Sequence, residues 1–183
     1  MGCDKALLQC DGKTLLERAL ATVGSVAQNA AIVGDADKYS QFGRVVEDIY
    51  RNCGPLGGIH AALTASETDY NLMLAVDMPF IPHELLEFLI VRARSSRSIV
   101  TAPEADGRLQ PLCAVYHRQF LTVAEQALMR RENKITSLFE TVDTHIISST
   151  ELRSAGFAVD VFRNWNTLAD LEPEIATGKS ERR

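Results

Sequence analysis

Apolar residues in this chain occur partly in short continuous runs and partly at helical spacing. The clearest continuous run is Leu72–Val76, which is followed directly by Asp77 and then by Met78-Pro79. Such a run is typical of a strand buried on both faces of a parallel sheet, and proline ends it because proline has no N–H to donate. The pattern therefore places the Asp77 carboxylate at the carboxyl end of a central strand, the edge where open α/β sheets bind ligands. Asp77 could instead cap a helix or begin a turn, which are common positions for aspartate.

The same patterns predict an alternation of strands and helices along the chain. Strands are predicted at 30–33, 45–48, 72–76, 99–103, 109–116, 143–147 and 159–162. Helices are predicted at 14–26, 59–65, 82–94, 120–129, 135–140 and 164–172, with a short helix or turn at 37–43. Thr14 and Glu17 have the spacing of a capping box at the start of the first helix. This alternation predicts a doubly wound α/β fold with a mostly parallel sheet and helices on both faces.

Length and composition are those of an ordinary globular domain. The 183 residues suffice for one domain with a proper core, which we expect to span 1–175, followed by a flexible C-terminal tail at 176–183. Hydrophobic residues make up 46%, charged residues 23%, and the formal net charge is −5, a balance that does not favour nucleic-acid binding. No apolar run approaches the roughly 20 residues that span a bilayer, and no signal-peptide segment is evident. We therefore expect a cytoplasmic protein with neither nucleic-acid nor membrane partners.

The cysteines and histidines are too dispersed to indicate a zinc site or a Cys-His nucleophile. The four cysteines form no C-x-x-C pair, and none has a histidine at ligand spacing. They are predicted to be reduced thiols, with Cys113 buried in a strand.

A glycine-rich stretch, Gly54-Pro-Leu-Gly-Gly58, directly precedes the helix predicted at 59–65. Glycines let the backbone approach a ligand closely, and a helix N-terminus attracts anions. The stretch is therefore a candidate phosphate-binding loop, although a tight connection into the helix would have the same composition.

Four stretches have a characteristic order: Met1-Gly-x-Asp-Lys5-x-Leu-Leu, Glu47-Asp48 with Gly54-Pro-Leu-Gly-Gly58, Asp77-Met-Pro-Phe-Ile-Pro82, and Asn164-x-Asn-Thr167. Together they resemble the nucleotidyltransferase family of the MobA-like molybdenum cofactor guanylyltransferases. A fifth stretch, Pro111-Leu-x-Ala-Val-Tyr116, is similar to the strand that follows the acceptor-side loop in that family. Order and spacing match over essentially the whole chain.

The resemblance implies a Rossmann-like fold that binds GTP and Mg²⁺ and joins GMP to molybdopterin with release of pyrophosphate. Lys5 and Asp77 would be the catalytic residues: Lys5 would contact the nucleotide phosphates, and Asp77 would hold Mg²⁺, assisted by Asn166 at the metal or the acceptor phosphate. The implied nucleotide-binding residues are Gly2, Lys5, Gly34, Asp48, Gly54, Pro55, Leu56, Gly57 and Asp77. Gly34 stands where a relative can have a polar side chain, so it could offer only a backbone contact. Besides GTP and molybdopterin, the implied partners are other molybdenum cofactor biosynthesis proteins or chaperones of the target enzymes.

One part of the family pattern is absent from this sequence. The family begins with a strand and a loop of the type L-A-G-G-x-S-x-R-M-G, whereas this chain starts at the last two residues of that signature. The segment would supply a central strand and backbone amides that hold phosphates. We therefore expect the natural chain to begin further upstream. Without the segment we expect weak nucleotide binding and an unpaired sheet edge.

Two alternatives remain open. A cytidylyltransferase, or a transferase for a sugar phosphate, would share most of these motifs, and a comparison of GTP with CTP would separate them. A non-catalytic nucleotide- or partner-binding subunit would keep the fold without its phosphate loop. Outside the resemblance, Lys5 would be read as an ordinary surface lysine.

Overall fold

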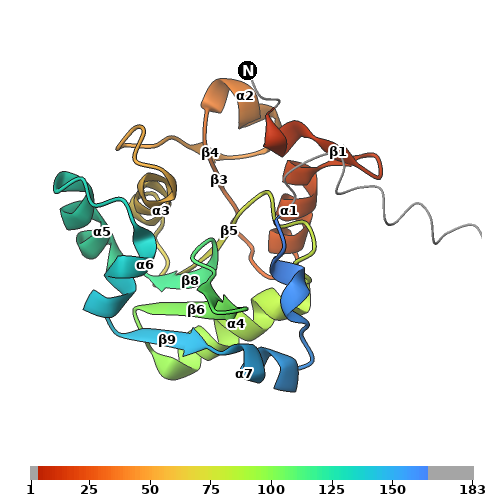
Figure 1. The fold of residues 1–183 in the computed structure, drawn as a ribbon. Helices are drawn as coiled ribbons and strands as arrows, with labels where there is room; N and C mark the ends of the chain where they lie inside the picture. Colours follow the sequence, from red (N-terminus) through yellow and green to blue (C-terminus); the bar gives the residue numbers. More distant parts are fainter. Residues whose placement is uncertain (1–3, 165–183) are drawn as a thin grey trace, which may run out of the picture.

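The computed structural model describes residues 4–164, in which helices pack on both faces of a sheet (Figure 1). The α-helices are α1 Leu15–Gly24, α2 Ala36–Tyr39, α3 Pro55–Thr64, α4 His83–Ser96, α5 Phe120–Met129, α6 Ile135–Leu138 and α7 Ser149–Ser154. Short 3-10 helices are η1 Lys5–Leu7, η2 Ser40–Phe42, η3 Phe139–Thr141 and η4 Val159–Phe162. The helix predicted at 120–129 is confirmed residue for residue as α5. None of the helices in the described range is long and apolar enough to cross a membrane.

The strands form one larger sheet and two small pairs. They are β1 Gln9–Cys10, β2 Lys13–Thr14, β3 Ile32–Val33, β4 Val45–Val46, β5 Tyr70–Leu74, β6 Val100–Ala105, β7 Arg108–Leu109, β8 Cys113–His117 and β9 Thr144–Ile147. In the larger sheet β8 lies between β5 and β6, and β7 and β9 also pair with β6. β5, β6 and β9 run in one direction and β8 runs against them, while β3 and β4 form a separate parallel pair. The predicted α/β class is confirmed, with three of the five strands of the larger sheet, β5, β6 and β9, running in one direction.

Strand β8 separates two hydrophobic cores, because alternate side chains of a strand point to opposite faces. Ala114 and Tyr116 pack on the side of α3, α5 and α6, whereas Cys113 and Val115 pack on the side of α4 and α7. These four residues are at most 2% exposed. Helices therefore cover both faces of the sheet, and the prediction that Cys113 is buried in a strand is confirmed.

Strand β5 is more exposed than its apolar sequence suggests. It covers Tyr70–Leu74 and is an end strand of the described sheet, and each of its residues is only partly buried. The prediction of a central strand at 72–76, buried on both faces, is therefore wrong for the range 4–164, because an apolar run does not report how many neighbours a strand has. Ala75 and Val76 lead out of the strand, so Asp77 follows a short connection rather than the strand itself.

The N-terminal elements pack around a third, smaller core. The predicted capping box is confirmed: Thr14 Oγ1 accepts a hydrogen bond from the Glu17 N–H at 3.1 Å, and the Thr14 N–H donates to Glu17 Oε2 at 2.7 Å. Leu16 of α1 then packs with Ala6 of η1 and Ile32 of β3. This contact brings the start of the described chain beside β3.

Two predicted strands differ from the structure. The stretch 109–116 is divided into β7 and β8, because Gln110 and Pro111 form a turn that the Cys113 N–H closes on the Gln110 carbonyl at 3.1 Å. The stretch 159–162 is the 3-10 helix η4, and its apolar residues cover the α4 side of the sheet. A short apolar run fits a strand or a buried helical turn equally well. The helix predicted at 164–172 lies, apart from its first residue, outside the described residues.

Candidate functional site

Gly54 and Pro55 begin helix α3 where the sequence suggests a loop. Gly54 has φ 62° and ψ −156°, a conformation that glycine adopts without a Cβ penalty. Pro55 lies in the first turn of the helix, where backbone N–H groups have no acceptor within the helix, so the missing N–H of proline costs no hydrogen bond. The helix therefore starts at Pro55 rather than at Ile59, and the glycine-rich stretch is its first turn. No side chain caps its N–H groups, which with the helix dipole favour a bound anion.

Two glycines allow this first turn to lie against its neighbours. A Cβ at Gly57 would be 2.8 Å from the Tyr50 carbonyl oxygen, and one at Gly58 would be 3.3 Å from Val33 Cγ1 and 3.8 Å from Asp48 Oδ1. The first contact is with backbone, which cannot rotate away. Glycine at these positions therefore brings α3 against the ends of β3 and β4, and against the Asp48 carboxylate.

Asp48 holds a carboxylate oxygen that is buried without a hydrogen-bond partner. The residue is partly buried two positions after β4, and its Oδ1 is out of contact with solvent. Burial raises the pKa of this carboxyl above its usual value, because the charged form loses hydration. An unpaired buried acceptor is costly unless a ligand supplies a donor, so Asp48 is a candidate contact for N–H or O–H groups.

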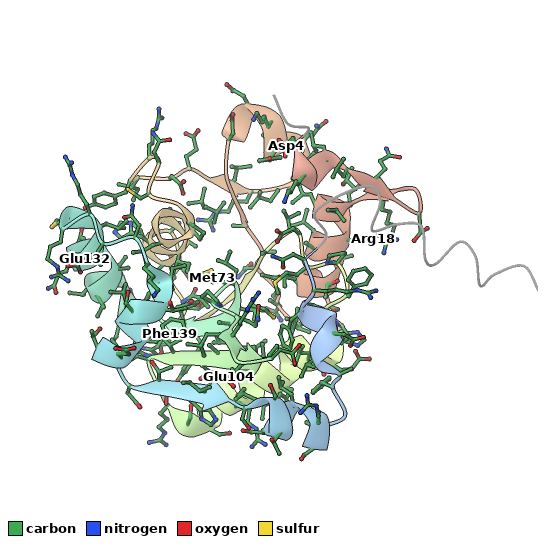
Figure 2. All side chains as sticks on the ribbon, in the orientation of Figure 1. Asp4, Arg18, Met73, Glu104, Glu132 and Phe139 are labelled. Carbon is green, nitrogen blue, oxygen red and sulfur yellow. The ribbon has the colours of Figure 1, made fainter. Side chains whose placement is uncertain are left out.

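The start of the described chain is tied to the end of β3 by Tyr39. The Tyr39 hydroxyl donates to Asp4 Oδ2 at 2.8 Å, and Lys38 Nζ lies 3.8 Å from the same oxygen. Burial, followed by the hydrogen bond and charge of Asp4, raises the pKa of Tyr39 to about 12. Its ring covers Gly34, where a Cβ would be 2.9 Å from Tyr39 Cε2. Asp4, labelled in Figure 2, also caps η1, accepting from the Ala6 N–H at 3.1 Å, so these contacts hold the turn that carries the exposed Lys5.

Asp77 lies in a turn between β5 and α4. The Met78 N–H donates to the Ala75 carbonyl at 3.3 Å, and the Ile81 N–H donates to the Met78 carbonyl at 3.4 Å. Met78 and Ile81 are at most 5% exposed and fix the turn to the core, while Asp77 is partly exposed. Its carboxylate makes no ion pair or hydrogen bond with the residues described. A partly exposed, unpaired carboxylate suits a hard cation such as Mg²⁺.

The structure thus groups several of the predicted residues. Gly34 lies beside β4, since its N–H donates to the Val46 carbonyl at 3.0 Å, and Asp48, Gly54, Pro55, Leu56 and Gly57 lie at the start of α3. Leu56 is fully buried and belongs to the core on the α5 side, so its side chain supports the turn and only its backbone is available to a ligand. Gly2 and Asn166 lie outside the described residues. Within 4–164, no three His, Cys, Asp or Glu side chains gather at metal-binding distance.

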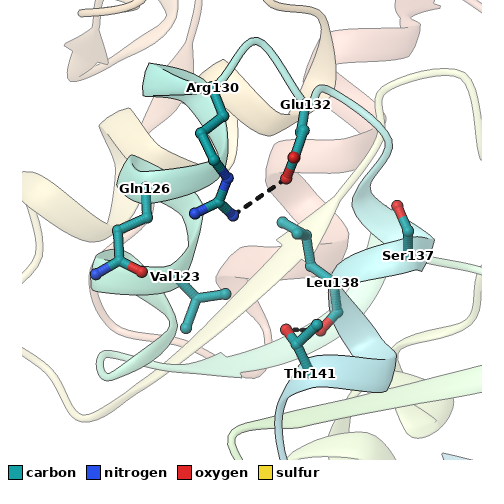
Figure 3. Close-up of a pocket in the computed structure, with 7 residues that line it drawn as sticks. All are labelled: Val123, Gln126, Arg130, Glu132, Ser137, Leu138 and Thr141. Carbon is teal, nitrogen blue, oxygen red and sulfur yellow. Dashed lines mark hydrogen bonds and ion pairs between the residues drawn. The ribbon is translucent and has the colours of Figure 1, made fainter.

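A hollow of about 400 Å³ lies elsewhere, between α5 and the α6–η3 segment (Figure 3). It is lined by Val123, Gln126, Arg130, Glu132, Ser137, Leu138 and Thr141. Arg130 and Glu132 pair across its rim at 3.1 Å. None of the predicted site residues lines it.

Tyr39 is not among the residues predicted from the sequence, although it is a polar-tipped aromatic just after the Gly34-Asp35 end of a strand. That position is a weak signal, because an aromatic residue in a short helix is usually a core residue. Its contacts with Asp4 and Gly34 become evident only when the fold brings them together.

A sheet covered by helices on both faces, with an uncapped glycine-rich helix start beside an unpaired carboxylate, is typical of α/β nucleotide-binding proteins. The family model described as "MobA-like NTP transferase domain" matches residues 1–146. The chain belongs to this MobA-like family and is a nucleotidyltransferase.

Individual relatives agree with this assignment over nearly the whole chain. The "Probable molybdenum cofactor guanylyltransferase" of Methanosarcina acetivorans is 31% identical to this chain, and the match covers 97% of this chain and 86% of the relative. The "Molybdenum cofactor guanylyltransferase" of Desulfosudis oleivorans is 30% identical, and the match covers 99% of this chain and 90% of the relative. Among solved structures, molybdopterin-guanine dinucleotide biosynthesis protein A from Archaeoglobus fulgidus has a TM-score of 0.81 and 26% identity, and covers 96% of this chain and 91% of its own.

Proposed function

We propose that this chain transfers GMP from GTP to the phosphate of molybdopterin and releases pyrophosphate. The names of the Methanosarcina and Desulfosudis relatives support the reaction. The observation that carries the proposal in this chain is the buried, unpaired Oδ1 of Asp48 beside the first turn of α3.

Asp48 would accept a hydrogen bond from the nucleoside. Guanine carries ring and exocyclic N–H donors on one edge, and a carboxylate is a strong acceptor for such donors. The N–H groups at the start of α3 and the backbone at Gly34 lie on the same side of the fold and would contact the remaining polar atoms. The ligand would thereby satisfy the acceptor that the fold leaves unpaired.

Lys5 would neutralise charge on the phosphates, and Asp77, with Asn166, would hold Mg²⁺. The oxygen donor of Asp77 fits this ion, which is usually held by one or two carboxylates together with substrate phosphates. When bound, Mg²⁺ would withdraw charge from the phosphoryl oxygens. The chain's own task is to keep Lys5 on the η1 turn and Asp77 on the β5–α4 turn in fixed places.

The reaction needs no nucleophile from the protein. A phosphate oxygen of molybdopterin forms a bond to the α-phosphorus of GTP, and the bond from that phosphorus to the bridging oxygen breaks as pyrophosphate leaves. Charge develops on the phosphoryl oxygens, so that positioning and neutralisation supply the catalysis. We place the reaction in the cytoplasm, with cofactor biosynthesis proteins or target-enzyme chaperones as partners that supply or receive the pterin.

Titration calorimetry with GTP and Mg²⁺ tests the first step, with CTP and ATP as comparators. We expect binding of GTP in preference to CTP, and formation of the dinucleotide when molybdopterin is added. Asp77→Ala should abolish product formation. Binding of CTP in preference to GTP would contradict the choice of guanylyl transfer.

Asp143→Ala is the matched control for Asp77→Ala. Asp143 is an exposed aspartate directly before β9. Because β5 and β9 run in the same direction, Asp143 lies at the opposite edge of the sheet from Asp77. Its substitution should leave product formation unchanged, and an equal loss in both variants would contradict the role of Asp77.

A further inference from the structure

Two residues join the end of the described chain to the turn that carries Asp77. The guanidinium carbon of Arg163 lies 3.9 Å from the centre of the Phe80 ring, close enough for attraction between a cation and an aromatic face. Phe80 lies three positions after Asp77, and Arg163 directly follows η4. Figure 1 shows the blue end of the described chain running back past the start of α4.

Phe162 anchors the same segment in the core. It is 6% exposed and packs in the cluster that contains Met78 and Ile81, the residues that flank Pro79-Phe80. The backbone at Arg163 is extended, with φ −63° and ψ 131°, so the side chains of Phe162 and Arg163 leave the segment in different directions. Phe162 packs in the same core cluster as the turn residues Met78 and Ile81, and Arg163 stacks on Phe80.

The turn needs such support because its own bonds are weak. The two backbone hydrogen bonds within the turn measure 3.3 Å and 3.4 Å, beyond the usual range for N–H donors, and Pro79 has no N–H to add another. A short bond holds the backbone at the first residue of the turn, from the Ala75 N–H to the Leu112 carbonyl at 2.7 Å. The Asp77 carboxylate has no partner of its own among the described residues. Packing by Met78, Phe80 and Ile81 is therefore what fixes the direction of the Asp77 backbone.

We infer that the stack of Arg163 on Phe80 is a positioning contact for Asp77, holding the β5–α4 turn in the geometry in which the carboxylate presents itself to a metal-bound nucleotide. The inference rests on the function proposed above and extends it to two residues outside the predicted site. Neither residue is a catalytic residue, since both act through the backbone of the turn. A displacement of the turn by a fraction of an ångström would lower the rate rather than abolish binding.

The chain contains a matched pair for comparison. Arg92 lies over the Phe88 ring at 4.9 Å and pairs with Glu151 at 3.0 Å. Both stacks lie on the α4 side of the sheet, but Arg92 and Phe88 belong to the middle of α4, and Arg92 pairs with Glu151 of α7 rather than stacking on a residue of the Asp77 turn. Arg92→Ala therefore measures the loss of a similar surface contact without a change at the turn.

The experiment measures kcat, the KM for GTP and the Mg²⁺ concentration for half-maximal dinucleotide formation. For Arg163→Ala and for Phe80→Leu we expect kcat to fall about tenfold and the Mg²⁺ requirement to rise about tenfold, with KM for GTP within about twofold of wild type. For Phe80→Tyr, which keeps the aromatic face, kcat, the KM for GTP and the Mg²⁺ requirement should all stay within about twofold of wild type. The double variant should lose less than the sum of the two single effects, because both changes break the same stack.

Arg92→Ala should lower the melting temperature and leave the Mg²⁺ requirement unchanged. If Arg163→Ala and Phe80→Leu behave in the same way as Arg92→Ala, the stack is merely structural and the inference is wrong.

A second readout separates this inference from the proposed function. If the wild type forms no dinucleotide, guanylyl transfer fails, and the rise in melting temperature on addition of Mg²⁺ and GTP is measured instead. The positioning role is supported if the wild type and Arg92→Ala show this rise at the same Mg²⁺ concentration, while Arg163→Ala and Phe80→Leu need about tenfold more Mg²⁺ for it. The same Mg²⁺ dependence in all variants, or no rise in the wild type, overturns it.

Discussion

At the scale of single residues, Asp48 illustrates a conflict between stability and ligand binding. Its Oδ1 is buried without a partner, and burial raises the pKa of its carboxyl. Because the pKa of the Asp48 carboxyl is higher in the folded than in the unfolded chain, its protonated form favours the folded state at low pH. This contribution to the free energy of unfolding is lost as the pH rises through the folded-state pKa. At neutral pH the ionised Asp48 therefore destabilises the unliganded fold.

Asp48→Asn should raise the free energy of unfolding at neutral pH by about 1 kcal/mol, because it removes a buried charge. The same change should weaken GTP binding about tenfold, since a charged acceptor is replaced by a neutral one. Chemical denaturation and calorimetry measure the two effects. Asp143→Asn, at an exposed position, should change neither. A variant that is less stable and binds GTP normally would contradict the role given to Asp48.

Tyr39→Phe should lower the free energy of unfolding by about 1 kcal/mol, because the Asp4 carboxylate loses its hydroxyl donor. The ring still covers Gly34, so the change isolates the hydrogen bond. GTP affinity should fall several-fold as the η1 turn with Lys5 loosens. Tyr70→Phe is the control, since Tyr70 contacts His117 through its ring. Equal melting temperatures for both variants would show that the hydrogen bond from Tyr39 to Asp4 does not contribute to stability.

At the scale of elements, the first turn of α3 depends on glycine for space rather than for flexibility. A Cβ at Gly57 would be 2.8 Å from the backbone oxygen of Tyr50. At Gly24, the last residue of α1, a Cβ would have no atom within 4 Å. We therefore expect substitution by alanine to change the free energy of unfolding in opposite directions at Gly57 and Gly24.

Gly57→Ala should lower the free energy of unfolding by about 1–3 kcal/mol, because the helix must move away from Tyr50. It should also weaken GTP binding, since the N–H groups of the first turn move with it. Gly24→Ala should raise stability by about 0.4–1 kcal/mol, because alanine has less freedom in the unfolded chain. Thermal denaturation of both variants measures the difference. A neutral Gly57→Ala would show that the turn has room to shift.

The elements also show what a sequence can predict. Helix α5 and the capping box of α1 were predictable, because apolar spacing and the Thr14–Glu17 pair are local signals. The start of α3 and the nature of η4 were not, since glycine and proline at a helix start resemble a loop, and a short apolar run fits strand or helix. The position of β5 at the end of the described sheet depends on its neighbours rather than on its own residues.

At the scale of the whole molecule, α3 and α5 are joined through a buried histidine. His60 is 3% exposed, its Nδ1 has no hydrogen-bond partner among the described residues, and its Nε2 lies 4.0 Å from Glu125 Oε1. Tyr50 packs edge-on against its ring at 5.0 Å. Burial lowers the pKa of His60, and the charge of Glu125 opposes this only in part.

The fold should therefore lose stability as the pH falls below the ordinary histidine value of 6.5. Between that pH and the lower pKa of folded His60, the unfolded chain binds a proton at this histidine and the folded chain does not. The free energy of unfolding therefore falls over this pH range. Denaturation between pH 7.5 and 5 measures the loss, and His60→Gln should reduce its steepness. His83→Gln is the control, because His83 is exposed at the start of α4. The same pH dependence in all three proteins would exclude His60 as the cause.

The candidate site was predictable only in its parts. The motifs at Asp48, Gly54 and Asp77 stand out in the sequence because glycines, prolines and acids next to apolar runs are unusual, whereas Lys5 was predicted only through the family resemblance. The contacts that hold those parts, Tyr39 on Gly34 and Arg163 on Phe80, join residues that different elements contribute. No local pattern encodes such pairs, since they arise when separate elements pack.

The alternation of β8 between two cores restricts how the length of this chain can change. Deleting one residue before Tyr116 would turn its ring from the α5 side to the α4 side, and would turn Val115 the other way. Both cores would then be mismatched at once, so a single-codon deletion there would act as two core substitutions. Insertions and deletions during the divergence of such chains should therefore concentrate in exposed turns such as Asp106-Gly107, leaving the spacing within β8 constant.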